Sequence, residues 1–213
     1  MSKITILGGT GYTGTNIARE AVARGHEVTS FSRNAPAEPV DGVRYLTGDV
    51  EAELDTLIDD ADVLVGSIPP RGEFESKVTG LYDQAIARAA ESGTRLVVIG
   101  GWSALRLSPD ATRTAYTDAV PEAFAAEAKI MAEVVDTLVD SAPEKLDWVY
   151  VSPAATYGSY NPGEAKGEYR TGGEVAIFDA DGNSNASGVD FALAVVDEIE
   201  SPKFSRQQFG VAY

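Results

Sequence analysis

Seven residues near the start of the chain have the types and the spacing to bind a dinucleotide. The apolar run at residues 4–7 leads into Gly8-Gly9-Thr10-Gly11-Tyr12-Thr13-Gly14, and apolar residues at helical spacing follow. Glycines permit a sharp turn, let backbone N–H groups approach a pyrophosphate, and let a helix pack close to a strand. We therefore expect a strand, a tight turn and a helix whose N-terminus binds phosphate. A glycine turn without a ligand is the alternative.

The next expected strand, residues 27–31, ends in Ser32-Arg33-Asn34. In dinucleotide-binding folds an acidic side chain at this strand end binds the ribose 2′-hydroxyl of NAD, whereas an arginine accommodates the 2′-phosphate of NADP. The chain has Ser32 and Arg33 here and no acid, which favours NADP(H) over NAD(H). The alternative for Arg33 is a solvated cation in a loop.

Further ligand contacts are expected where later strands end. Asp49 could meet an adenine amino group or cap the following helix, and capping is the commoner role. Trp102 and Ser103 follow a strand at residues 95–99, where open parallel sheets bind ligands. The predicted cofactor-binding residues are Gly8, Thr10, Gly11, Tyr12, Thr13, Gly14, Ser32, Arg33, Asp49, Val50, Ser67, Ile68, Pro69, Gly100, Lys129 and Pro153. The predicted substrate residues are Trp102, Ser103 and Tyr157, with Phe74 as a further stacking candidate; ordinary packing is the alternative for the aromatic ones.

Strands and helices alternate along most of the chain. The expected strands are residues 4–7, 27–31, 43–46, 61–66, 95–99 and 146–151, and the expected helices follow the glycine turn, surround residues 54–58, and cover residues 73–91 and 121–138. This order predicts an α/β fold: a single doubly wound Rossmann-fold domain, residues 1–213, with a mostly parallel sheet.

The pattern of apolar residues changes after residue 153. The run 163–173 has no apolar core pattern, and only residues 175–178, a helix over 190–199 and residues 209–213 look ordered. The segment 154–213 is too short for a second domain, so we expect it to fold over the strand ends and close a substrate cleft.

Composition narrows the functional classes. Thirty-three acidic and 17 basic side chains give a formal charge of −16, which repels nucleic acid and anionic lipid, so neither is an expected partner. There is no cysteine and one histidine, His26, in a helix-to-strand turn, so we expect no metal site and no catalytic role for His26. No apolar run reaches the ~20 residues that span a bilayer, and a strand beginning at Lys3 leaves no room for a signal peptide. A cytoplasmic location and a small-molecule partner are expected, and the oligomeric state stays open.

Several motifs together resemble a known family. The chain is similar to the atypical short-chain dehydrogenase/reductases, specifically the NmrA-like NAD(P)H-binding group and, within it, the NADH-flavin reductase family. The similarity is carried by the glycine turn, Gly25-His26-Glu27-Val28-Thr29, Leu146-Asp147-Trp148, Val151-Ser152-Pro153-Ala154-Ala155, Gly167-Glu168-Tyr169-Arg170-Thr171-Gly172-Gly173, Asp179-Ala180-Asp181-Gly182-Asn183-Ser184 and Val211-Ala212-Tyr213. The resemblance implies a Rossmann fold, a nicotinamide cofactor, and hydride transfer to a flavin or another planar acceptor.

The chain departs from the wider dehydrogenase pattern at one place. That pattern has a catalytic tyrosine four residues before a lysine, but Lys129 is preceded at this spacing by Ala125. Alcohol–ketone chemistry then has no obvious proton donor, and no catalytic residue is predicted. Lys129 could reach the nicotinamide ribose or be a surface lysine. Three functions fit: an NADPH-dependent reductase of a flavin or quinone-like acceptor, an NmrA-like cofactor sensor that turns nothing over, or a reductase or isomerase of another small metabolite.

Overall fold

The computed structural model describes all residues from 1 to 213, and its strands join in one eight-stranded sheet. The spatial order is β3-β2-β1-β4-β5-β6-β8-β7, and every neighbouring pair is parallel except β7 with β8. The strands are β1 (Lys3–Leu7), β2 (Glu27–Ser32), β3 (Val43–Thr47), β4 (Val63–Gly66), β5 (Arg95–Ile99), β6 (Trp148–Ser152), β7 (Arg170–Gly172) and β8 (Gln207–Ala212).

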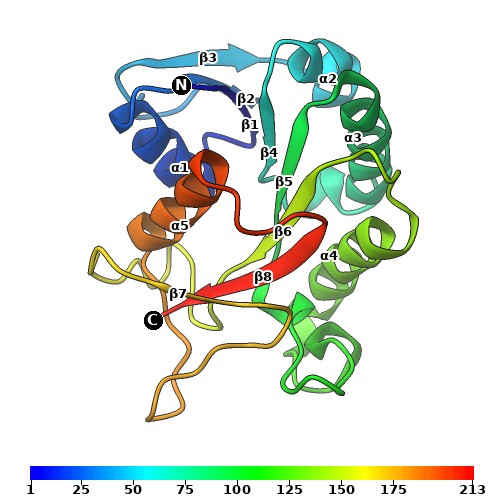
Figure 1. The fold of residues 1–213 in the computed structure, drawn as a ribbon, viewed down its shortest axis with the longest axis vertical. Helices are drawn as coiled ribbons and strands as arrows, with labels where there is room; N and C mark the ends of the chain where they lie inside the picture. Colours follow the sequence, from blue (N-terminus) through cyan, green and yellow to red (C-terminus); the bar gives the residue numbers. More distant parts are fainter.

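Helices cover both faces of the sheet (Figure 1). One face carries α1 (Tyr12–Ala23) and α5 (Gly188–Glu200), which pack against each other, and the other carries α2 (Val50–Asp59), α3 (Val78–Ser92) and α4 (Glu122–Ser141). Three short 3-10 helices, η1 (Gly72–Phe74), η2 (Trp102–Ala104) and η3 (Thr114–Tyr116), lie in the connections. The predicted α/β Rossmann architecture with a mostly parallel sheet is confirmed. None of the helices combines the length and the apolar character needed to cross a bilayer.

Burial on both faces explains why the central strands are continuously apolar. Every residue of β4, β5 and β6 is buried, as expected for parallel strands between two helical layers. The chain passes from β1 out to β3 and then returns to place β4 on the other side of β1. The connections that leave the carboxyl ends of β1 and β4 therefore diverge there, which opens the crevice where such sheets bind ligands.

Two elements differ from the expected ones. Helix α3 begins at Val78 and not at residue 73, because the chain first forms the separate 3-10 helix η1 and Lys77 is the N-cap of α3. Strand β7 lies inside the run that has no apolar pattern: it is an edge strand with two exposed residues and needs no buried side chains. Residues 175–178 form no strand; Ala176 N–H only donates to Arg106 C=O, at 2.8 Å.

The C-terminal segment is part of the sheet as well as of the crevice. Strand β8 pairs with β6, while the loop after β6 approaches the crevice. Buried Asp190, on α5, holds a second loop by accepting hydrogen bonds from Lys166 N–H at 2.7 Å and Gly167 N–H at 2.9 Å. Burial alone would raise the pKa of the Asp190 carboxyl, but these bonds and one from the Tyr213 hydroxyl hold its pKa below the usual value. This loop is therefore anchored to α5 by an ionised carboxylate.

Candidate functional site

The glycine turn between β1 and α1 is shaped by three close backbone contacts. Gly8 has a φ of +78°, which favours glycine, and its N–H donates to Phe31 C=O at 2.9 Å. A Cβ on Gly9 would collide with the Ser30 hydroxyl, and one on Gly14 would lie 2.5 Å from Gly8 C=O. Gly8, Gly9 and Gly14 therefore let the helix, the turn and β2 approach one another.

The start of α1 has unused hydrogen-bond donors. Its N-cap, Gly11, supplies no side-chain cap, and the N–H groups of Tyr12, Thr13 and Gly14 have no acceptor within the protein. A Cβ on Gly11 would meet only Gly8 C=O, at 3.3 Å, so the space in front of the turn is open. Free donors at the positive end of a helix dipole fit the pyrophosphate of a dinucleotide.

The end of β2 lies beside this turn. Thr10 N–H donates to the Ser32 hydroxyl at 3.3 Å. Arg33 forms an ion pair with Glu73, and its guanidinium carbon lies 5.2 Å from the centre of the Phe74 ring. Arg33 is therefore not a freely solvated cation, although 54% of its side chain is exposed. Phe74 is buried in the core, so the expectation that it stacks on an acceptor is wrong.

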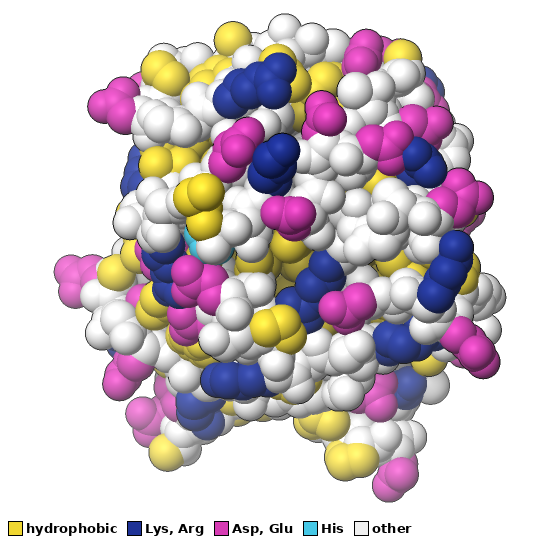
Figure 2. Space-filling view, turned by 45° about the horizontal axis from the view of Figure 1, so that its top comes forward, with side chains coloured by type: hydrophobic (Ala, Val, Ile, Leu, Met, Phe, Trp, Pro, Cys, Tyr) yellow, Lys and Arg dark blue, Asp and Glu magenta, His cyan; other side chains and the backbone are white.

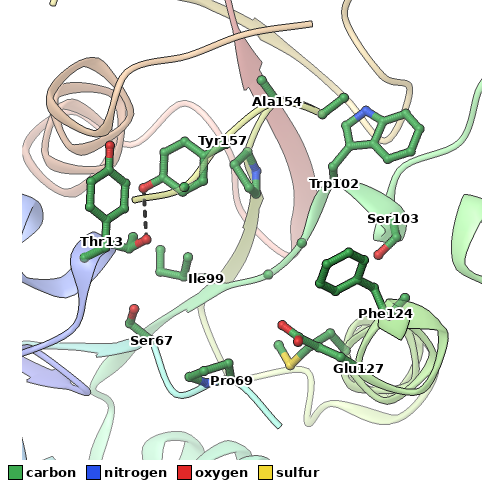
Figure 3. Close-up of a pocket in the computed structure, with 18 of the residues that line it drawn as sticks. Thr13, Ser67, Pro69, Ile99, Trp102, Ser103, Phe124, Glu127, Ala154 and Tyr157 are labelled. Carbon is green, nitrogen blue, oxygen red and sulfur yellow. Dashed lines mark hydrogen bonds between the residues drawn. The ribbon is translucent and has the colours of Figure 1, made fainter. Parts of the chain in front are cut away.

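A cavity of about 790 Å³ opens at the carboxyl ends of the central strands (Figure 3). It brings together ten predicted residues, namely Gly11, Tyr12, Thr13, Ser67, Pro69, Gly100, Trp102, Ser103, Pro153 and Tyr157. Its other lining residues are Arg71, Ile99, Gly101, Val120, Phe124, Glu127, Ala128, Met131, Ala154, Ala155, Gly158, Ser159 and Tyr160. Segments distant in the sequence therefore share one space.

The cavity has two chemically different halves. We call the part around Gly11, Tyr12, Thr13, Ser67 and Tyr157 the nucleotide half, because it contains the start of α1. We call the part around Trp102, Ser103, Phe124, Glu127 and Met131 the aromatic half. Figure 3 shows the labelled members of the two sets on opposite sides of the view, with Ile99 beside Thr13, Ser67 and Tyr157.

Tyr157, one of the predicted substrate residues, lies in the nucleotide half of the cavity. Its hydroxyl is 2.9 Å from the Thr13 hydroxyl, and its ring packs on Phe191, with ring centres 4.8 Å apart. Burial raises the pKa of the Tyr157 phenol, so this group stays protonated at neutral pH and can donate a hydrogen bond. Tyr157 also lines the cavity, so its predicted contact with a substrate stays a prediction, while its hydroxyl meets α1 and its ring packs on α5.

Trp102 belongs to the wall of the aromatic half. It begins η2, directly after the carboxyl end of β5, and its indole nitrogen is buried without a hydrogen-bond partner in the protein. Phe124 and Met131, which α4 presents to the same half, were not among the predicted residues. The apolar spacing of α4 gave no signal for them, because cavity-facing and core-facing positions look alike.

The remaining predicted cofactor residues do not line this cavity. Gly8 and Gly14 shape the turn, and Thr10 bonds to Ser32. Asp49 caps α2 by accepting a hydrogen bond from Glu51 N–H at 3.0 Å, the commoner of the two roles considered for it. Val50 and Ile68 pack in the core.

Lys129 also lies outside the cavity. It is exposed on α4, whereas Glu127, Ala128 and Met131 of the same helix face the cavity. This geometry corresponds to the surface-lysine alternative and gives no support to contact with a nicotinamide ribose.

A buried polar chain anchors the loop next to Trp102. Arg113, 3% exposed, donates to Ala104 C=O at 2.7 Å and to the Asp136 carboxylate at 2.6 Å. It also bonds to Gln208, whose amide nitrogen donates to the Ser152 hydroxyl at 3.0 Å. Arg113 thus fixes this loop to α4, β6 and β8.

His26 lies at the other end of the strands, in the turn before β2. Its Nδ1 accepts a hydrogen bond from Ser2 N–H at 3.1 Å, and its Nε2 is 3.1 Å from the Glu200 carboxylate. It takes no part in the cavity.

Several known proteins are similar to this chain in sequence or in fold over almost its whole length. YwnB of Bacillus subtilis, described as uncharacterized, is 32% identical over 98% of this chain and 97% of its own. A solved structure of a "putative exported protein" from Burkholderia pseudomallei is 36% identical, covers 100% of both chains and has a TM-score of 0.86. A "putative NADH-flavin reductase" from Streptococcus pneumoniae is 26% identical, covers 100% of this chain and 99% of its own, and has a TM-score of 0.84.

A family profile matches most of the chain. The family is described as NAD(P)H-binding, and the match covers residues 8–202. This range contains the glycine turn, the free donors of α1 and both halves of the cavity. The chain therefore belongs to the NAD(P)H-binding family and has the fold of its oxidoreductase-like members.

Proposed function

We propose that this protein is an NADPH-dependent reductase that transfers hydride to a flavin or to a quinone-like planar acceptor. The observation that carries the proposal is the shared cavity: free backbone donors suited to a dinucleotide lie in one half, and apolar and aromatic side chains lie in the other. The description of the Streptococcus pneumoniae relative as an NADH-flavin reductase is in line with this class of acceptor.

The residues of each half have distinct tasks in this proposal. The N–H groups of Tyr12, Thr13 and Gly14 would bind the pyrophosphate. Trp102 and Phe124 would pack against the acceptor and exclude water. A bound reduced nicotinamide supplies the hydride, so the chain itself has to orient and shield the reactants.

The absence of a positioned acid–base pair favours a planar redox acceptor over an alcohol or ketone. Ala125 stands where the wider family has a tyrosine, and Lys129 is turned away from the cavity. The Tyr157 phenol is engaged by Thr13 in the nucleotide half. Hydride transfer to a flavin or quinone needs no side chain to protonate a developing alkoxide, so the site is suited to it.

The proposal includes NADPH as the preferred donor and a cytoplasmic location. Ser32 lies beside the glycine turn, Arg33 follows it, and the end of β2 itself carries no acidic residue, although Glu73 is ion-paired with Arg33. A guanidinium can form charge-assisted hydrogen bonds to a phosphate, which supports a preference for the 2′-phosphate. The absence of cysteine is compatible with a reducing compartment.

Turnover by the purified protein tests the proposal. NADPH should be oxidised when riboflavin, FMN or menadione is added, and oxidation with NADH should be slower at the same concentrations. Tight binding of NADPH without oxidation by any of these acceptors would contradict it and support the cofactor-sensing alternative. Turnover of an alcohol or sugar substrate alone would contradict the planar-acceptor assignment.

A further inference from the structure

Two charged side chains, Arg71 and Glu127, line the cavity, and they are paired with each other. The Nε of Arg71 donates to one carboxylate oxygen of Glu127 at 2.7 Å, and its Nη2 donates to the other at 2.9 Å. This two-point geometry is the strong form of the arginine–carboxylate interaction. The remaining lining residues are apolar, aromatic, glycine or hydroxyl-bearing.

The pair joins two walls of the cavity. Arg71 follows Pro69 in the connection between β4 and α3, and Glu127 projects from α4 close to Phe124 (Figure 3). Glu127 is 28% exposed and Arg71 is 67% exposed, so the arginine is the outer partner. The carboxylate therefore stands inside the aromatic half and the guanidinium at its margin.

The pair leaves the aromatic half without net charge. The hydrogen bond from Arg71 to Glu127 is the main cause that raises the pKa of the guanidinium, so the cation persists at neutral pH. Glu127 occupies the Nε–Nη2 edge of Arg71, so an anionic ligand that takes this edge must displace Glu127 and leave this carboxylate unpaired next to the new anion. The chain adds a formal charge of −16, and Figure 2 shows acidic side chains spread among basic ones over the face in view.

We propose that the Arg71–Glu127 pair restricts the acceptor to planar molecules whose ring system carries no negative charge. An uncharged ring can fill the space between Trp102 and α4 while the pair stays intact, whereas a ring-bound anion meets Glu127. This inference rests on the proposed function and narrows its acceptor to neutral quinones and to flavins whose phosphate stays outside the aromatic half.

The test compares menadione with naphthoquinone sulfonate, which carries its negative charge on the ring system. Binding of each is measured by calorimetry to protein saturated with NADP⁺, so that no turnover is involved, and steady-state kinetics with NADPH follow. Wild-type protein should bind menadione about tenfold more tightly than the sulfonate, as expected for one unfavourable charge contact.

Two matched variants locate the effect. Glu127→Gln removes the competing charge and frees Arg71, so the ratio of the two affinities should move about tenfold toward the sulfonate. Glu133→Gln lies at an exposed position of the same helix, outside the cavity, and changes the net charge equally. It should leave the ratio as in wild type. In the Glu127→Gln background, Arg71→Ala should remove the gained affinity for the sulfonate.

The outcomes separate the proposed exclusion of ring-bound anions, which we call the charge rule, from the proposed reductase function. Equal binding of both quinones by wild-type protein, or equal shifts in the two glutamate variants, would overturn the charge rule while leaving the reductase activity standing. Binding of both quinones without NADPH oxidation would overturn the proposed turnover and leave the charge rule intact. A protein that binds neither quinone would overturn both.

Discussion

The two halves of the cavity are built from very different stretches of chain. The nucleotide half is organised around one contiguous turn, residues 8–14, in which the N–H groups of Tyr12, Thr13 and Gly14 have no acceptor within the protein. The aromatic half is assembled from β5–η2, α4 and the segment after β4, which are far apart in the sequence. Backbone donors in a turn depend on a few glycines, whereas a wall of side chains depends on how whole elements pack. The backbone donors of the nucleotide half can therefore be predicted from local sequence, whereas the wall of the aromatic half cannot.

The largest expected effect comes from closing the open space in front of the turn. Gly11 has a φ of −77°, so a valine is conformationally allowed there, but its side chain would block approach to the free N–H groups of α1. Losing two or more charge-assisted bonds should weaken NADPH and NADH binding about 100-fold or more. Calorimetry measures this. Gly80→Ala, in open space on α3, is the control and should bind both normally. An unchanged cofactor affinity in Gly11→Val would contradict the assignment of this turn as the dinucleotide-binding site.

The next effect tests whether the nucleotide half selects the cofactor through a side chain. Arg33→Ala should weaken NADPH about tenfold, leave NADH nearly unchanged, and reduce the salt dependence of NADPH binding, because one phosphate contact is lost. The measurement is a titration of both nucleotides at low and high salt. Equal affinities of the wild-type protein for NADPH and NADH would contradict the proposed preference.

What could be predicted follows the same division between local and distant contacts. The strand at residues 95–99 could be predicted because burial on both faces requires a continuous apolar run. The turn after β1 could be predicted because a positive φ favours glycine at position 8. Strand β7 could not be predicted from the sequence pattern, because an edge strand needs no alternation of apolar residues. The contact between the Tyr157 and Thr13 hydroxyls was not predicted, because the two residues are 144 positions apart. No local pattern specifies such a pair.

The charged residues show the same limit. Arg71 and Glu127 each look like ordinary surface residues in the sequence, and only the packing of α4 beside the segment after β4 makes them one ion pair. Arg113 lies in a segment that reads as a polar loop, yet it is buried and bonds to three elements or loops. Long-range polar contacts of this kind follow from the tertiary fold.

A third prediction addresses the aromatic half alone. Trp102→Ala should raise the acceptor KM or lower kcat/KM by about two- to tenfold, the range expected for one aromatic contact, while NADPH affinity changes little. Trp102→Phe keeps an aromatic ring and should retain most of the activity. Steady-state kinetics with menadione and riboflavin provide the measurement. If Trp102→Ala impaired NADPH binding as much as acceptor turnover, the separation of the cavity into two halves would fail.

The smallest expected effect concerns the ion pair that occupies Arg33. Its guanidinium lies against the Phe74 ring, which helps to orient it, but Glu73 holds part of its hydrogen-bonding face. A 2′-phosphate would have to displace Glu73, and an exposed pair of this kind contributes about 0.2–1 kcal/mol. Glu73→Gln should therefore tighten NADPH binding by about 1.5- to fivefold and leave NADH unchanged.

The control for this variant is its exposed neighbour. Glu75 forms no ion pair, so Glu75→Gln changes the net charge equally without releasing Arg33. Calorimetric titration of NADPH should separate the two variants at low salt, and the difference should shrink at high salt because exposed charges are screened. In an Arg33→Ala background, Glu73→Gln should have no effect beyond that of Glu75→Gln. A gain that persists without Arg33 would mean that Glu73 acts through the general negative field of the chain, and the nucleotide half would then discriminate between cofactors without a dedicated side-chain contact.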